Sequence, residues 1–178
     1  KQIKNTDPDA LVLDTGALIF EQHHLYPPYE PISRMTAHLM IDILNKIDMD
    51  AVNVSAMDLA DGPDSLVMYD KLSSWPWLSA NVVKRGTEER LFAPDLMKTV
   101  GALRIGIFGF MDQTTIGVPF FDDRSSIQVL DPVETARSEV EKLRKEGANL
   151  VIALAYMDKD DVERLLDTVS GINLIIYG

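Results

Sequence analysis

Few side chains in this sequence are suited to acid–base or metal chemistry, because it contains only three histidines and no cysteine. The absence of cysteine excludes disulfide bonds, thiolate metal sites and cysteine nucleophiles. His23 and His24 are adjacent, and both could reach one metal ion if the following stretch, 25–29, forms a bent loop, as its prolines indicate. The more common role for such a pair is that of solvated loop histidines. His38 falls in a predicted helix, where we expect an ordinary surface or partly buried residue.

Three apolar runs, 10–13, 51–54 and 150–155, are each followed by a turn. This arrangement places functional side chains at the carboxyl edge of an α/β sheet. The residues that these turns offer are Ala17, Ala56, Met57 and Tyr156. None of them is a good ligand for a hard or borderline divalent cation, which prefers carboxylate, amide oxygen or imidazole.

Two carboxylates, Asp14 and Asp58, lie in the same segments and are candidates for polar contacts there, together with His23 and His24. Capping and turn hydrogen bonds explain both carboxylates more simply than catalysis does. The aromatic and proline-rich stretch 26–31 is interpreted as packed loop, with an exposed contact surface as the alternative.

The composition is that of a globular domain. The 178 residues are 46% hydrophobic and 25% charged, with a net charge of −11. Such an acidic balance argues against a nucleic-acid groove, and the apolar runs are too short to insert into a membrane. No signal peptide is visible. We expect residues 1–178 to form a single domain that is truncated at both ends, because the chain closes on a strand-like run with no tail after it.

Strand-like runs alternate with amphipathic, helix-like stretches. Helices are predicted over 33–47, 62–72, 132–147 and 158–169, and strands over 10–13, 51–54, 77–83, 91–100, 103–110, 150–155 and 172–177. The first helix is expected to carry one apolar stripe, which contains Met35, Leu39, Ile43, Leu44 and Ile47. The runs 91–100 and 103–110 lie on either side of Gly101 and are predicted to form a β-hairpin. The alternation predicts a largely parallel sheet covered by helices.

Six segments in collinear order are similar to a known family: DALVLDTGALIF, DAVNVSAMDLADG, WLSANV, LRIGIFGFMDQTT, DPVETARSEVEKLRKEGANLVIALAYM and GINLIIYG. Together they resemble the 5′-nucleotidase and UDP-sugar hydrolase family of calcineurin-like metallophosphoesterases. The resemblance implies an α/β fold, a metallophosphoesterase-like sandwich of two mixed β-sheets flanked by helices. It also implies a periplasmic or extracellular location, because these hydrolases are commonly exported.

The resemblance further implies where metal ligands would fall. The bridging Asp of the family corresponds to Ala17, and a later His ligand corresponds to Tyr156. The family's Asn ligand and the His that assists the leaving group correspond to Ala56 and Met57, with Asp58 in place of a Glu. A bridging carboxylate offsets the repulsion between two dications, and a methyl group cannot. We therefore expect no family-type binuclear centre.

Two functions follow as hypotheses. The first is a 5′-nucleotidase-like domain that has lost its metal ligands and serves as a binding or structural module for an unknown protein or small molecule, with no cofactor. The alternative is a metal-dependent hydrolase of nucleotides or UDP-sugars, with a rebuilt site that uses one divalent metal ion through His23, His24 or residues outside this segment.

Overall fold

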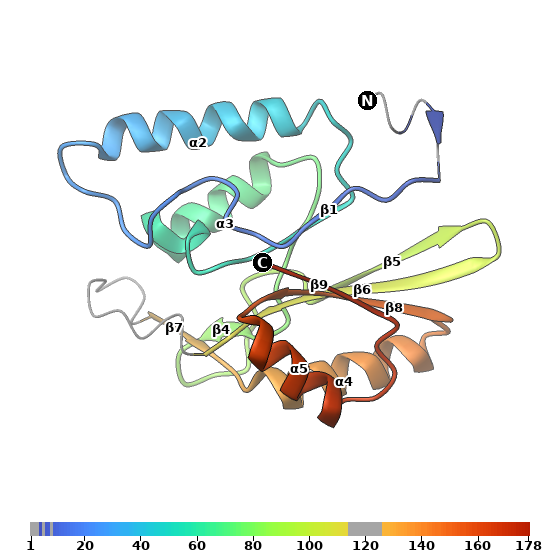
Figure 1. Cartoon of the computed structure of the whole chain (residues 1–178). Coiled ribbons are helices and arrows are strands. Elements are labelled where there is room, and N and C mark those ends of the chain that lie inside the picture. Colours follow the sequence, from blue (N-terminus) through green and yellow to red (C-terminus); the bar gives the residue numbers. More distant parts are fainter. Residues whose placement is uncertain (1–3, 5, 8, 114–125) are drawn as a thin grey trace.

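A computed structural model describes residues 4, 6–7, 9–113 and 126–178 (Figure 1). Within these residues the chain forms four layers. Helices α2 (Glu30–Leu44) and α3 (Pro63–Leu72) cover one sheet, and α4 (Pro132–Lys145) and α5 (Lys159–Thr168) cover the outer face of a second (Figure 1). This is the α/β sandwich that the sequence predicts.

The two sheets are built differently. The first contains β1 (Leu13–Asp14), β2 (Ala51–Asn53) and β3 (Trp77–Leu78), all parallel. The second is mixed: β5 (Asp95–Val100) is antiparallel to β6 (Leu103–Met111), and β8 (Leu150–Tyr156) and β9 (Leu174–Tyr177) continue parallel to β6. The antiparallel pair confirms the predicted hairpin. A separate ribbon pairs β4 (Val82–Lys84) with β7 (Ile127–Val129).

An apolar layer between the sheets holds them face to face. It includes Leu78, Ile107 and Leu154, all fully buried. The approach is closest at Gly109 of β6, where an added Cβ atom would lie 2.4 Å from the Asn53 side-chain oxygen and 2.7 Å from the Leu78 carbonyl oxygen. Contacts this short require glycine, so the sequence sets the distance between the two sheets at this point.

One predicted strand proves to be two. The run 77–83 divides into β3 and β4, which belong to different sheets. Between them, buried Asn81 donates from its side-chain amide to the Met111 carbonyl (2.7 Å) and accepts from the Met111 N–H (3.1 Å). These bonds satisfy main-chain groups at the end of β6 while the chain crosses from one sheet to the other. The prediction of one continuous strand was therefore wrong.

The apolar stripe predicted on α2 is divided between the core and solvent. Leu44 is buried together with Ala37 and Ile41, whereas Met35, Leu39 and Ile43 are exposed. These inner residues belong to the apolar core that α2 shares with α3 and the first sheet.

Buried Asp50 fixes the start of β2. Its carboxylate accepts a hydrogen bond from the Val12 N–H (2.9 Å) and forms ion pairs with Lys4 (2.7 Å) and Lys98 (2.9 Å). Burial alone raises the pKa of Asp50, but the hydrogen bonds from both lysines and from Val12 outweigh burial and lower it.

Helix α4 begins as predicted, with Asp131 accepting from the Glu134 N–H (2.9 Å). Among the described residues, no helix is long and apolar enough to cross a bilayer.

Candidate functional site

The carboxyl ends of strands from both sheets meet at one edge of the sandwich. Asn53, the last residue of β2, donates from its side-chain amide to the Thr15 carbonyl after β1 (3.2 Å) and to the Phe110 carbonyl in β6 (3.0 Å). The chain after β9 reaches the same edge, because a Cβ atom at Gly178 would lie 2.6 Å from the Thr15 hydroxyl oxygen. The turns after β1, β2 and β8 therefore share this edge, which is where α/β folds carry their sites.

Asp58 joins the turn after β1 to the turn after β2. It is 1% exposed, and its carboxylate accepts hydrogen bonds from the N–H groups of Ala17 (2.9 Å), Leu18 (2.8 Å) and Ile19 (3.2 Å). The same carboxylate accepts from the Ser55 hydroxyl (2.6 Å) and the Ser55 N–H (3.1 Å). The successive amides of 17–19 thus form an anion-binding concavity, and a carboxylate of the chain itself fills it.

The two carboxylates at this edge are perturbed in the same direction. Burial raises the pKa of Asp58, opposed by the hydrogen bonds from Ser55 and the main chain. Burial likewise raises the pKa of Asp14, which accepts from the Gly16 N–H (2.8 Å). Asp14 therefore closes a local turn, whereas Asp58 bridges two turns that are about forty residues apart in sequence.

The backbone at the end of β1 adopts an unusual conformation. Gly16 has φ +102° and Ala17 has φ +60°. Gly16 has no substitute here, since a Cβ atom would lie 2.7 Å from the Ser55 Cβ and 2.8 Å from the Asn53 carbonyl oxygen. Ala17 adopts a left-handed conformation that costs a residue with a Cβ atom roughly 1–2 kcal/mol. The turn therefore keeps a strained geometry that alanine does not favour, and such strain clusters at functional sites.

The remaining candidate positions differ in exposure. Ala56 is fully buried, Met57 is partly exposed, and Tyr156, at the end of β8, packs partly buried against the core beneath α2 and α3. Burial raises the pKa of the Tyr156 hydroxyl, and the charges of Asp58 and Asp158 raise it further. Tyr156 consequently presents a neutral hydroxyl on the side of the edge where Asp58 lies.

Two of the three histidines make ring contacts with tyrosines. His24 packs its ring against Tyr26 with ring centres 4.2 Å apart, and the exposed His38 meets the buried Tyr69 edge-on at 5.2 Å. His23 is partly buried in the same loop as His24. Within the described part of the chain, no three His, Asp or Glu side chains gather in a way that could hold a metal ion.

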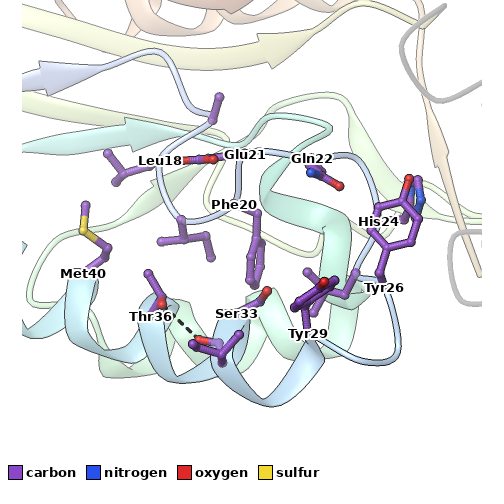
Figure 2. Close-up of a pocket in the computed structure, with 14 residues that line it drawn as sticks. Leu18, Phe20, Glu21, Gln22, His24, Tyr26, Tyr29, Ser33, Thr36 and Met40 are labelled. Carbon is purple, nitrogen blue, oxygen red and sulfur yellow. Dashed lines mark hydrogen bonds between the residues drawn. The ribbon is translucent and has the colours of Figure 1, made fainter.

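A cavity of about 480 Å³ opens beside Ala17, between the loop 17–29 and α2. Figure 2 shows Phe20, Ser33 and Thr36 bordering this space, with Met40 at one end and His24 and Tyr26 at the other. Sequence reasoning did not predict this cavity. The aromatic stretch that follows His24 was the available signal, but the packing of the loop on α2 is a tertiary feature.

Comparison with known proteins identifies relatives of this chain. It is 26% identical over 186 residues to the 5′-nucleotidase of Mus musculus, an alignment that covers 100% of this chain and 30% of the relative. It is 30% identical over 122 residues to Protein UshA of Yersinia enterocolitica, covering 66% of this chain and 22% of that protein. The chain thus spans less than a third of the length of these curated relatives. No protein-family model matches it.

The crystal structure of the calcineurin-like phosphoesterase YfkN from Bacillus subtilis matches the fold with a TM-score of 0.82 at 22% identity, over 99% of this chain and 60% of that one. The chain is therefore a homologue, over most of its length, of the 5′-nucleotidase/UshA family and has the fold of calcineurin-like phosphoesterases.

Proposed function

We propose that this chain is a 5′-nucleotidase-like phosphoesterase domain that has lost its metal ligands and acts as a binding or structural module. The observation that carries the proposal is the state of the turn after β1. The backbone of this turn is strained and left-handed at Ala17, and Asp58 fixes it through a hydrogen bond. The side chain that the turn presents at Ala17 is nevertheless only a methyl group.

The groups at this edge do not fit the two divalent cations that the family resemblance implies. Ala17 and Ala56 offer methyl groups and Met57 a thioether, which is a poor ligand for hard cations. Asp58 directs both carboxylate oxygens to donors of its own chain. A metal ion that competed for Asp58 would leave the buried N–H of Ile19 without its acceptor, at a cost of about 1–3 kcal/mol.

The alternative, a hydrolase with a rebuilt site, is favoured by one observation. The cavity beside Ala17 is bordered by Glu21 and His24, a carboxylate and an imidazole that could serve acid–base chemistry. The apolar character of most of the other lining residues, such as Leu18, Phe20 and Met40, argues for ligand binding rather than hydrolysis.

Hydrolysis of 5′-AMP and UDP-glucose by the purified protein, with and without added Mn²⁺, separates the two functions. We expect no Mn²⁺-dependent turnover from the wild type. We also expect none from Ala17→Asp, because one restored carboxylate would stand in an incomplete ligand set. Turnover that falls by about tenfold or more in His24→Gln, with folding unchanged, would contradict the proposal and establish the alternative.

A further inference from the structure

Helix α2 presents a row of large apolar side chains to solvent. Met35, Leu39 and Ile43 follow one another at intervals of four residues and are 65%, 57% and 45% exposed. Ile32, on the same face, is 57% exposed. In Figure 1 the helix forms the outermost layer on its side of the molecule, so its outer face is open. Residues spaced four apart form the ridge by which helices most often pack on one another.

The cavity described above runs beside this ridge. Its floor includes Phe20, its α2 wall includes Thr36 and Met40, and Tyr29 lies at the N-terminal end of the helix (Figure 2). One surface therefore carries both a ridge and a parallel groove. A surface that contains both shapes complements itself after a two-fold rotation, which is the condition for a dimer of identical subunits.

We propose that this face is the two-fold interface of a homodimer, in which α2 of one copy packs antiparallel on α2 of a second copy. Leu39 lies near the two-fold axis, and the ridge of each copy enters the groove of the other. The groove is the cavity that Ala17 and His24 also border, so a ridge seated in it would occupy the space that a ligand would otherwise take.

The exposed apolar area is close to what such an interface needs. The side chains that supply it are about half exposed or more; they are Tyr26, Tyr29, Ile32, Met35, Leu39 and Ile43. Together they offer roughly 600 Å², against about 800 Å² per partner in a standard interface. The walls of the groove and the polar rim supply the difference. A patch of this size is at the upper limit for an ordinary monomer.

Charge supports the antiparallel arrangement. Lys46 follows the C-terminal end of α2 and lies seven residues beyond Leu39, whereas Glu30 begins the helix. Antiparallel pairing about Leu39 therefore brings Lys46 of each copy to the N-terminal turn of the other helix, which carries Glu30 and the exposed ring of Tyr29. The net charge of −11 opposes association, but salt at physiological strength screens charges over about 8 Å.

Sedimentation velocity of the wild type and of two matched variants tests the proposal. We expect a dimer at micromolar concentration and a dissociation constant at least about thirtyfold higher for Leu39→Glu, since a central apolar residue is replaced in both copies. Leu166→Glu is the control, because Leu166 is 42% exposed on α5, remote from this face. Circular dichroism melts establish that both variants fold.

The sequence contains no cysteine, so a single introduced thiol reports the geometry directly. Leu39→Cys should give a disulfide-linked dimer under mild oxidation, and Leu166→Cys should stay monomeric. A wild type that remains monomeric at high concentration overturns the proposal, even if it binds an added basic amphipathic peptide. A dimer that Leu39→Glu leaves intact, or equal cross-linking of both cysteine variants, overturns it as well.

Discussion

Replacing Asp58 by asparagine should loosen the turn that follows β1. The carboxylate has two oxygens that accept from the N–H groups of Ala17, Leu18 and Ile19 and from Ser55. An asparagine amide is nearly the same size but has one acceptor oxygen and one group that only donates. In its better orientation the amide oxygen faces Ser55 and Ala17, so the amide nitrogen opposes two main-chain donors.

The size of the effect follows from those two donors. A buried N–H left without an acceptor costs about 1–3 kcal/mol, so two cost roughly 2–6 kcal/mol. Removing a buried charge offsets part of this, because burial raises the pKa of Asp58 and so penalises its ionised form. We expect a net loss of about 2 kcal/mol in the free energy of unfolding. Asp14→Asn is the matched control, since Asp14 accepts from Gly16 alone among the described donors and an amide oxygen can replace it.

Urea denaturation followed by circular dichroism measures both effects. With a slope of about 2 kcal/mol per molar urea, Asp58→Asn should lower the midpoint by roughly 1 M, and Asp14→Asn by less than about 0.5 M. Hydrogen exchange should also accelerate at the amides of 18 and 19 in the Asp58 variant. Equal midpoints for the two variants, or unchanged exchange at those amides, would refute the reasoning.

Other substitutions test the backbone, the sheet packing and the electrostatics. Ala17→Gly should be neutral or stabilising by up to about 1 kcal/mol, because the relief of left-handed strain exceeds the added chain entropy; a loss above about 1 kcal/mol would contradict the reported φ. Gly109→Ala should cost about 3 kcal/mol in thermal or urea unfolding, since its Cβ meets Asn53. Gly106→Ala should cost less, because its contacts are longer, with Leu143 methyl carbons at 2.9 and 3.0 Å and the Leu143 Cβ at 3.1 Å, and the two methyl groups can shift. The folded-state pKa of Asp50 lies below the ordinary 3.8, so its stabilisation is present above that value and is lost as pH falls through the lowered pKa. Asp50→Asn should therefore flatten the loss of stability in acid, and an unchanged pH profile would exclude this ion pairing.

The order of helices and strands could be predicted from the sequence, because the spacing of apolar residues and the positions of capping and turn residues indicate the same boundaries. Asp131 before a proline predicts the start of α4, and Gly101 between two apolar runs predicts the hairpin of β5 and β6. The division of 77–83 into two strands could not be predicted, because the change of sheet depends on Asn81 satisfying the main chain of Met111. That contact is distant in sequence and leaves no periodic signal.

Which residues of the α2 stripe are buried could not be predicted, for a related reason. The apolar stripe through Leu39 is a normal core pattern, and the sequence does not distinguish a stripe that packs against the core from one that is exposed to solvent. Similarly, Asp58 could be recognised as a residue that forms turn hydrogen bonds, but its bonds to the turn containing Ala17 require the register of β1 on β2. Sequence predicts the local role of such a carboxylate, and only the fold identifies its partner.

Metal binding by the whole gene product tests the central claim most directly. The protein is stripped with a chelator, dialysed against Mn²⁺ or Zn²⁺, freed of unbound ion and analysed by inductively coupled plasma mass spectrometry. The proposed loss of metal ligands at Ala17, Ala56, Met57 and Tyr156 predicts a retained stoichiometry near zero. Two equivalents of retained metal per chain, together with hydrolysis of a nucleotide, would contradict it.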